Sequence, residues 1–528
     1  MPPFVKIKSL YTITLDWFEK HLLILARTQN GPAVRMKRRK FLAENVSYHC
    51  RQMILNRILD ISKYKCMYNY KLTLLEMLAD ENTIAVDFSK SGSMYIDDLF
   101  QLYRVLFMSK IINIFRLGIN VDMPEIDRKY LGEINIKMYK MLTYMRNLRW
   151  VTLNSIANLA MIRTLGAYAH HLEYLDVSRS YNIFDDAAPG LLIIEKIDIE
   201  QFSEAELIRL QVKTTPCANK LKYICFSETF LGTKGAIIFL KYAPNLRSLG
   251  GPSNGFSTSE LVSWVQPPGK LLKLNLVSLN DGRLLRKNAE NIPLFCPDLE
   301  EVSISASSIP SLVLLQPISK LTIDMDYKAW ADDIWNYIWA RGEFLKELIL
   351  QSNINGPIEL GWFVDVTPNL EVLTACLECH YPSDYFGNWD QLKTADIVVR
   401  TSKCLMNFTL HAPNLENLNI WFEPPIRYIK SDEYKCINDD LFVVIVIEGG
   451  LRKLKKLIIN KCSIGPAGVE CLLLNCPDLS CLGYLREWEN FTEEDIEKLK
   501  ARAIVSNWEL DLKYAQYIER SFTCCMDL

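Results

Sequence analysis

The residues of this chain that could carry out chemistry are few, and their spacing does not assemble a reaction centre. Cys376-Leu377-Glu378-Cys379-His380 matches the Cys-x-x-Cys-His form used for covalent haem attachment. No exporting sequence or haem-enclosing fold is indicated, so a buried or loop cysteine is the expected role. The six histidines lack the His-Glu-x-x-His spacing of zinc sites and have no companion nucleophile motif. We therefore expect a protein that is not an enzyme and needs no cofactor or metal.

The composition indicates a globular protein without a bias toward polyanions. Of its 528 residues 49% are hydrophobic and 23% are charged, and 60 basic residues face 62 acidic ones. This balance favours neither nucleic acid nor an anionic membrane as partner. Fifteen cysteines without framework spacing, and no apolar signal core at the N-terminus, predict reduced thiols and a cytoplasmic or nuclear location. An apolar run of about 18 residues, as a membrane helix requires, is missing, so we expect a soluble protein.

A recurring Leu-x-x-Leu-x-Leu phrase organises most of the chain. Many neighbouring copies start 25 residues apart, within the roughly 20 to 29 residues of a leucine-rich repeat. The clearest copies begin at Leu172, Leu271, Leu299, Leu345, Leu415 and Leu454. Degenerate copies begin at Ile112, Leu148, Leu221, Leu246, Ile318, Leu370, Leu392 and Leu479. The second and third apolar positions would alternate inward on a short strand, and the following residues would return as a helix.

The expected fold is therefore α/β: a leucine-rich-repeat solenoid, shaped as a horseshoe with a parallel sheet on the concave side and helices outside. We expect a small all-helical domain over 1–80, repeats over 81–488, and a C-terminal cap and tail over 489–528. The capping-box spacing from Thr492 to Asp495 predicts a helix start in that cap. Longer gaps between phrases, from 172 to 221 and from 415 to 454, predict either an undetected repeat or an insertion, with a polar insertion over 423–440.

Several repeats share a short phrase before the first leucine. Cys296-Pro297-Asp298-Leu299 and Cys476-Pro477-Asp478-Leu479 are two examples, with related phrases at Ala243, Thr367 and Ala412. They resemble the cysteine-containing repeats of F-box and related receptors. Proline in this position would end the helix before the next strand begins.

The first 80 residues have a helical period but no repeat phrase. Leu10, Thr14 and Phe18 would form one stripe on a helix, able to enter a groove on a partner. A Gly31-Pro32 break follows, then a basic run from Arg35 to Lys40 that we expect in a solvated loop. An apolar residue recurs every four positions at Leu42, Val46, Cys50 and Ile54, which predicts a second stripe on a helix. Two amphipathic helices are implied.

The stretch from Ser9 to Phe18 resembles the elongin-binding BC box, with Thr14 where the box has Cys. The stretch from Leu42 to Cys50 is similar to the cullin-selecting box of VHL-box receptors, with Ala43 in place of Pro, and it also resembles the start of an F-box. Either resemblance implies an adaptor-binding helical box, for elongin C or the F-box adaptor, joined to a cullin. Its implied adaptor-binding residues are Leu10, Thr14, Phe18, Leu42, Val46 and Cys50. The alternative is a helical cap that covers the end of the repeat core.

On the predicted sheet, side chains between the buried leucines would face a partner. The mixed charges of this face predict a protein substrate bound by shape and local polar contacts, with Tyr174 and Trp421 as aromatic anchors. The candidate substrate-binding residues are Tyr174, Asp176, Glu301, Glu347, Thr374, Asn417, Asn419, Trp421 and Lys456. The combined hypothesis is a non-catalytic substrate-recognition subunit of a cullin-RING ubiquitin ligase. The alternative is a repeat scaffold unconnected with ubiquitin.

Overall fold

The computed structural model divides into two compact units, which are considered separately. The N-terminal unit comprises Ser9–Ile304 with Leu314–Gln316, and the C-terminal unit contains Ser305–Val313 and Pro317–Leu528. The structure describes residues 10–27, 32–60, 68–91, 93–121, 128–250, 257–266, 273–282, 284–324, 331–351, 358–379, 387–399, 401–421, 437–506 and 508–513.

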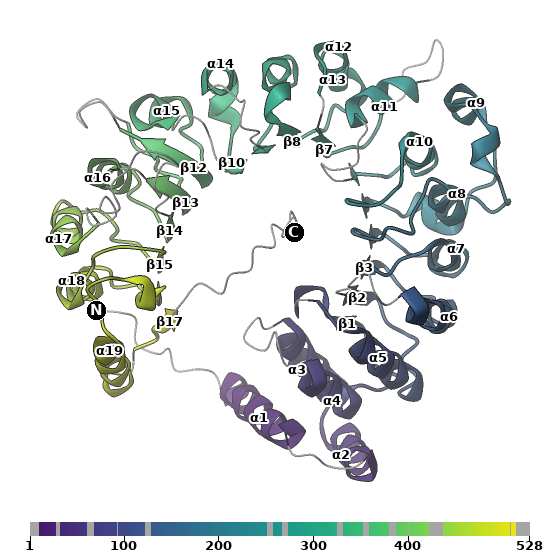
Figure 1. Ribbon diagram of the computed structural model, residues 1–528, viewed down its shortest axis with the longest axis horizontal. Coiled ribbons are helices and arrows are strands. Elements are labelled where there is room, and N and C mark those ends of the chain that lie inside the picture. Colours follow the sequence, from purple (N-terminus) through teal and green to yellow (C-terminus); the bar gives the residue numbers. More distant parts are fainter. Residues whose placement is uncertain are drawn as a thin grey trace. The chain divides into compact units, whose positions relative to one another are not determined.

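In the N-terminal unit, parallel strands follow one another along one side and helices lie along the other (Figure 1). The strands are β1 (Ala85–Asp87), β2 (Arg116–Asn120), β3 (Trp150–Asn154), β4 (Tyr174–Asp176), β5 (Tyr223–Cys225), β6 (Ser248–Leu249), β7 (Ser278–Asp281) and β8 (Glu301–Ser305). The helices are α1 (Leu10–Arg27), α2 (Pro32–Asn45), α3 (Tyr48–Asp60), α4 (Tyr68–Leu78), α5 (Ile96–Met108), α6 (Arg128–Tyr144), α7 (Leu159–Tyr168), α8 (Ala187–Leu192), α9 (Glu204–Arg209), α10 (Thr233–Tyr242), α11 (Thr258–Trp264), α12 (Arg286–Ala289) and α13 (Ile292–Phe295).

The C-terminal unit repeats this arrangement, again with parallel pairing throughout its described strands (Figure 1). Its strands are β9 (Lys320–Asp324), β10 (Glu347–Gln351), β11 (Ile358–Glu359), β12 (Val372–Glu378), β13 (Thr394–Val399), β14 (Asn417–Trp421), β15 (Lys456–Ile459), β16 (Cys481–Gly483) and β17 (Asp511–Lys513). Its helices are α14 (Ala331–Arg341), α15 (Leu360–Val366), α16 (Ser402–Leu410), α17 (Asp439–Ile447), α18 (Pro466–Asn475) and α19 (Glu493–Val505). The predicted α/β leucine-rich-repeat solenoid is confirmed.

The phrase leucines build the core as the alternation predicts. Leu415, Leu418 and Ile420 of one repeat are each no more than 1% exposed, whereas Asn417 and Asn419 between them are half-buried. Helices end shortly before the prolines of the repeat phrases: α18, for example, ends at Asn475, before Pro477. Burial of this continuous apolar stripe by neighbouring repeats supplies most of the stability that one repeat lacks.

Polar side chains also connect one repeat to the next. The asparagine that follows proline in three phrases donates from Nδ2 to a backbone carbonyl of the preceding repeat, at 2.7 to 2.8 Å. These asparagines are Asn245, Asn369 and Asn414. Asp185 accepts from the amides of Gly232 and Gly235, at 2.6 and 2.9 Å, and so caps the start of α10. A Cβ on Gly235 would lie 2.8 Å from that carboxylate, which explains the glycine.

Strand β7 corrects the predicted phrase at Leu271. The strand begins at Ser278, which pairs in register with Ser248 and Glu301. The repeat therefore uses Leu276 and Leu279, and its last apolar position is occupied by Asp281. Asp281 is 1% exposed and accepts from Ser257 Oγ at 3.1 Å and Ser259 N at 2.8 Å. Hydrogen bonds to the start of α11 thus replace the contacts of a buried leucine.

The phrase predicted to start at Ile112 is also displaced. Ile112 is 45% exposed, whereas Ile114, Leu117 and Ile119 are fully buried around β2. The two long gaps are insertions rather than missing repeats, because β4 pairs directly with β5 and β14 directly with β15. The first insertion contains α9, whereas α8 packs between α7 and α10 and is the helix of its own repeat. Most of the polar insertion predicted over 423–440 lies outside the described residues, which omit 422–436.

The N-terminal helices differ from the sequence prediction in two respects. The basic run lies within α2 rather than in a loop. The second predicted stripe does not form one helix, because α2 ends at Asn45 and α3 starts at Tyr48. Asn45 Nδ2 donates to the Phe41 carbonyl at 2.8 Å, one of the interactions at this helix end.

Candidate functional site

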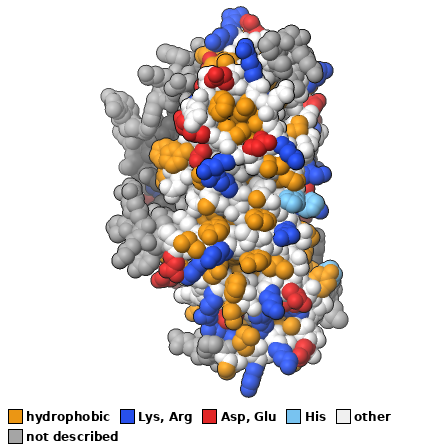
Figure 2. Space-filling view, turned by 90° about the vertical axis from the view of Figure 1, so that its right-hand side faces the viewer, with side chains coloured by type: hydrophobic (Ala, Val, Ile, Leu, Met, Phe, Trp, Pro, Cys, Tyr) orange, Lys and Arg blue, Asp and Glu red, His pale blue; other side chains and the backbone are white. Residues whose placement is uncertain are grey.

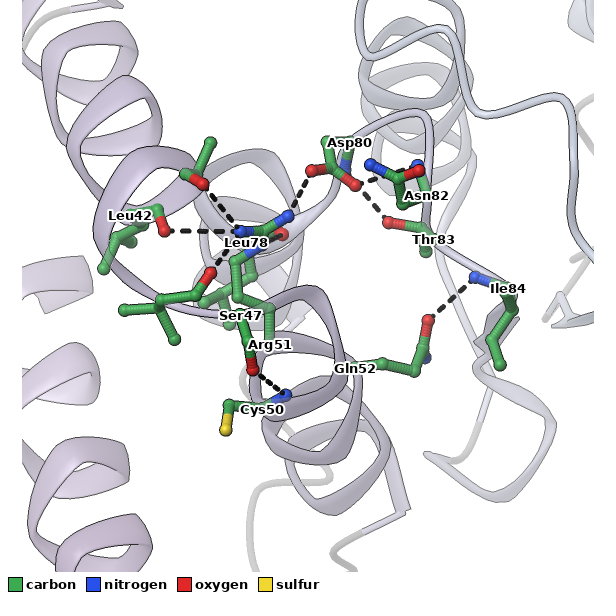
Figure 3. Close-up of polar contacts among 12 residues, drawn as sticks. Leu42, Ser47, Cys50, Arg51, Gln52, Leu78, Asp80, Asn82, Thr83 and Ile84 are labelled. Atoms are coloured by element: carbon green, nitrogen blue, oxygen red, sulfur yellow. Dashed lines mark hydrogen bonds and ion pairs between the residues drawn. The ribbon is translucent and has the colours of Figure 1, made fainter.

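A buried arginine holds the N-terminal helices together. Arg51 of α3 is 4% exposed and forms an ion pair with Asp80 (Figure 3). Its guanidinium also donates to four backbone carbonyls near the ends of α2 and α4, those of Leu42, Ala43, Val46 and Leu78. Carbonyls at a helix end have no partner inside the helix, so a fork of donors from a third helix satisfies them. Arg51 therefore fixes α2, α3 and α4 relative to one another.

The next residue connects α3 to the sheet. Gln52 accepts at Oε1 from the amides of Ile84 and Ala85, at 2.9 and 3.3 Å. Its Nε2 donates to the Ala85 carbonyl at 2.8 Å, and the contact with Ile84 is drawn in Figure 3. The side-chain amide of Gln52 thus forms hydrogen bonds with both the backbone N–H and the backbone carbonyl of Ala85 in β1, as a neighbouring strand would. Helix α3 serves as a cap on this end of the repeat core.

These contacts locate the second half of the predicted adaptor site. Leu42 is 5% exposed, and Val46 and Cys50 are half-buried. Cys50 contributes its amide to Ser47 Oγ at 3.4 Å. The Leu42 and Val46 carbonyls accept hydrogen bonds from Arg51, whereas most of the other residues between 42 and 50 are exposed.

Helix α1 carries the first half of the predicted site. It includes Leu10, Thr14 and Phe18 in its backbone; Phe18 is half-buried, and the side chains of the other two lie outside the described part. The buried face of α1 is formed by Leu15, Glu19, Leu22 and Ala26. On other faces Trp17 and Ile24 are each 57% exposed. Helix α1 therefore buries one face inside the protein and exposes two large apolar side chains on another. Exposed apolar side chains on one helix are typical of a surface that binds another protein.

The basic residues of α2 tie the helices to one another. Arg35 Nε lies 3.3 Å from Glu76 Oε2 of α4, and Arg38 Nη1 donates to the Leu25 carbonyl of α1 at 3.1 Å. Burial lowers the pKa of Arg39, an effect that the carboxylates of Asp80 and Glu76 oppose. The arginines of this run are thus part of the packing between helices.

The first residues of the strands β2 to β8 lie side by side and are here named the strand-start row. Its members are paired in register and are Arg116, Trp150, Tyr174, Tyr223, Ser248, Ser278 and Glu301. Three neighbouring members, Trp150, Tyr174 and Tyr223, form an aromatic ladder. The rings of Trp150 and Tyr174 stack at 3.7 Å and 11°, and Tyr223 lies 6.3 Å from Tyr174. Arg116 Cζ lies 4.8 Å from the Trp150 ring centre, while its Nε contacts Asp87 at 2.5 Å. The predicted anchor Tyr174 is thus the middle of a preformed stack.

Two residues further along β4, Asp176 has a different environment. It is 4% exposed and accepts from the Ser178 hydroxyl at 2.6 Å and amide at 3.0 Å. Burial raises the pKa of Asp176, although these hydrogen bonds and Arg179 oppose the shift. Burial and the nearby Asp176 carboxylate also raise the pKa of the Cys225 thiol, so Cys225 is not a reactive thiolate.

The C-terminal unit has its own strand-start row. Its members are Lys320, Glu347, Val372, Thr394, Asn417, Lys456, Cys481 and Asp511. Glu347 pairs with Lys320 at 3.0 Å, and Asn417 Nδ2 donates to Thr394 Oγ1 at 3.3 Å. Glu347, Asn417 and Lys456 are half-buried, as are Thr374 and Asn419 two residues further along their strands. Glu301 in the other unit has the same intermediate exposure.

Trp421, the second predicted anchor, belongs to a polar cluster that the sequence did not reveal. Its indole Nε1 donates to Asp396 Oδ1 of the neighbouring strand, and its ring lies 6.3 Å from that of Tyr484. Burial raises the pKa of Asp396, while hydrogen bonds from Trp421 and Asn419 and the charge of Lys456 oppose this. Asp396 could have been noticed only from its alternation with apolar residues on β13, because the phrase at Leu392 is degenerate.

The haem-like cysteines do not assemble a described metal centre. Cys376 lies within β12, and Cys379 is 8% exposed with its Sγ accepting from Asn407 Nδ2 at 3.0 Å. His380 lies outside the described residues. In the described ranges no cluster of three or more His, Cys, Asp and Glu residues is suited to hold a metal ion. No helix in those ranges is both long and apolar enough to span a membrane.

The face of the N-terminal unit that carries α6 to α10 shows no gathering of one charge (Figure 2). Viewed from the side of α6 to α10, apolar side chains lie interspersed with cationic and anionic ones (Figure 2). The exposed aromatic residues Tyr144 and Tyr168 are separate members of this surface, on α6 and α7. Dispersed apolar residues of this kind are ordinary on a protein surface, which makes α1 and the strand-start rows the better candidates for binding.

Comparison with known proteins adds no family. No family model matches the sequence, and no curated protein matches it. A chain in the crystal structure of the Rad7 and Elc1 complex in yeast has a TM-score of 0.35 and 13% identity, covering 94% of this chain and 91% of that one. A protein from Bacteroides fragilis has a TM-score of 0.25 and 13% identity, covering 46% and 76%. At these values the likenesses carry no argument about function.

Proposed function

We propose that this protein is a non-catalytic substrate-recognition subunit of a cullin-RING ubiquitin ligase. Its N-terminal helices would bind an adaptor, and its repeats would hold a protein substrate near the ubiquitin-loaded partner. The observation that carries the proposal is the exposed apolar surface of α1, where Trp17 and Ile24 are more than half exposed. This helix contains the stretch from Leu10 to Phe18 that resembles a BC box.

Two features of α1 support an adaptor-binding role. One face, with Leu15 and Leu22, already packs against the helical cap, so the helix does not need its other apolar residues to stay attached. An amphipathic helix binds a partner groove through residues spaced three, four and seven apart. Trp17 and Ile24 are seven residues apart, and both are exposed.

The cap region favours elongin C over the F-box adaptor. An F-box reading would require the stretch from Leu42 to contact a partner, whereas Leu42 is buried and its carbonyl is engaged by Arg51. Helix α1 lies outside that network. We therefore assign adaptor contact to α1 and structural support to α2, α3 and α4.

A repeat scaffold unconnected with ubiquitin is the second candidate function. The hydrogen bonds between Gln52 and β1 favour it, because they give the N-terminal helices a complete structural role as a cap. The two functions differ only in whether α1 has a partner.

A pull-down with the tagged full-length chain would separate them. The intact chain is expected to recover elongin C together with a cullin, and Trp17→Ser/Ile24→Ser is expected to lower that recovery about tenfold or more, as for central interface residues. Phe41→Ser is the matched control, because Phe41 is 62% exposed on the neighbouring helix α2. Recovery of no adaptor by the folded intact chain would favour the scaffold. An equal loss in the Phe41→Ser control would contradict the assignment of adaptor contact to α1.

A further inference from the structure

The residues that precede the strand-start row of the N-terminal unit form a basic edge. This edge row consists of Phe115, Arg149, Glu173, Lys222 and Arg247. Backbone hydrogen bonds of 2.6 to 2.8 Å join each member to the next, from Arg149 N to Phe115 O through to Arg247 N to Lys222 O. The row is therefore held at the spacing of the sheet itself. It contains three cations and one anion, and Arg116 of the strand-start row adds a further cation beside it.

The anions near this edge are already engaged. Glu173 pairs with Lys222 at 2.7 Å, and Asp87 pairs with Arg116 at 2.5 Å. Arg149 and Arg247 are exposed, and neither forms an ion pair within the described part of the chain. Arg149 lies instead over the ring of Phe115, with 5.6 Å between Cζ and the ring centre. Two exposed guanidinium groups therefore stand at either end of a neutral pair.

The aromatic ladder lies directly beside these cations. Trp150, Tyr174 and Tyr223 each follow an edge-row residue in the chain, and all three remain partly exposed. Further along the sheet, at β8, the equivalent positions are Glu300 and Glu301, so the charge reverses there. The basic and aromatic character is thus confined to β2 through β6.

Resting on the receptor function above, we propose that this surface binds an extended acidic peptide segment of the substrate. Two of its carboxylates pair with Arg149 and Arg247, and an apolar side chain between them packs on Tyr174 and Tyr223. Those arginines lie three strand spacings apart, about 14 Å, which is about four residues of extended peptide. The segment therefore carries acidic residues four positions apart with an apolar residue midway.

A nucleic acid is a poorer occupant. A phosphate backbone requires cations along its whole path, whereas Glu173 interrupts the row between Arg149 and Lys222. A peptide with two separated carboxylates matches this alternation, and guanidinium groups pair with carboxylates in a well-defined geometry.

Fluorescence anisotropy with the full-length chain and the labelled peptide Gly-Gly-Glu-Ser-Phe-Ser-Glu-Gly-Gly tests the proposal. Arg149→Glu/Arg247→Glu is expected to weaken binding about tenfold or more, and Tyr174→Ala about tenfold. Lys346→Glu is the matched control, because Lys346 occupies the equivalent edge position, before β10, in the C-terminal unit. It should leave the affinity nearly unchanged. Circular dichroism of each variant would establish that it is folded.

Several results would overturn the proposal. They are no binding of the peptide up to about 1 mM, equal binding of a version with Ser in place of both Glu residues, or equal loss in the Lys346→Glu control. Tighter binding of a short oligothymidylate would instead identify a nucleic-acid surface. Adaptor recovery measured on the same variants keeps the two proposals apart. Loss of peptide binding with adaptor recovery intact concerns this surface alone, and peptide binding without any adaptor would overturn only the ligase function.

Discussion

The edge rows of the two units use the same repeat position in different ways. In the C-terminal unit the corresponding row, which includes Lys346, Glu371, Lys393, Glu416 and Lys455, alternates in charge. Lys393 pairs with Glu371 at 3.2 Å and Lys455 with Glu416 at 2.7 Å. The edge row of the N-terminal unit has one such pair, between Lys222 and Glu173, and leaves cations on both sides of it. The residue before each strand therefore forms ion pairs between repeats in the C-terminal unit, whereas in the N-terminal unit Arg149 and Arg247 at this position are left to contact a ligand.

One tryptophan from each unit, Trp389 and Trp150, gives the comparison with the largest expected effect. Trp389 is fully buried in the C-terminal unit, packs edge-on against Phe363 and Phe408, and donates to Thr367 Oγ1 at 3.0 Å. Trp389→Ala is expected to cost about 3 to 5 kcal/mol. Trp150→Ala, which removes a partly exposed ring of the ladder, is expected to cost only about 1 kcal/mol. Urea unfolding measures both, and equal costs would contradict the contrast.

The second expected effect concerns the helices that precede the first strand of the N-terminal unit. Arg51→Met would leave Asp80 and the helix-end carbonyls without their shared donor, at a cost of about 3 kcal/mol. Arg57→Met on the same helix is the control, because the Arg57 side chain is 39% exposed and its contact with Glu19 at 3.3 Å is closer to the surface. Its cost should be about 1 kcal/mol or less. A neutral Arg51→Met would mean that other contacts, such as the Arg35–Glu76 ion pair and apolar packing, hold α2 and α4 in place.

A smaller effect is expected from the edge pairs themselves. A double-mutant cycle on Lys455 and Glu416 should give a coupling below about 1 kcal/mol that falls with added salt, because both side chains are partly exposed. The same cycle on Lys222 and Glu173 should agree with it. A much larger coupling in one unit would show that its edge is stabilised by charge in a way that the other is not.

The smallest expected effect is a pH dependence shared by the two units. Asp176 and Asp396 are the third residues of β4 and β13, and burial raises the pKa of both. Each folded carboxyl holds its proton more firmly than the unfolded one, so this contribution to stability is present at acid pH and is lost as pH rises through the folded pKa. Asp396→Asn should therefore raise Tm at neutral pH and leave it nearly unchanged in acid. A lower Tm at neutral pH would contradict the sign.

The fold could be predicted from the repeat leucines because each phrase spaces its apolar residues so that they face the core from one short strand. The prediction failed where another chemistry fills the same position, as at β7, where Asp281 replaces the last leucine and uses hydrogen bonds to α11. It also could not find β1 or β17, which are three residues long and carry no complete phrase.

The candidate binding surfaces were less accessible to sequence reasoning. Tyr174 could be named from alternation on its strand, but its stack with Trp150 depends on the register between two strands. The role of Arg51 depends on where two other helices end, and nothing in its neighbours along the chain indicates this. Spacing predicts what one element presents, whereas the contacts between elements require the folded chain.

The amide of Gln52 has a consequence for the behaviour of the protein in solution. An open strand at the end of a parallel sheet is a template on which a second chain can add its own strand, and such pairing leads to aggregation. By occupying the backbone groups of Ile84 and Ala85, Gln52 removes docking points at which another molecule would start to polymerise. A single side chain thereby helps to keep a long stack of repeats from growing beyond its own length.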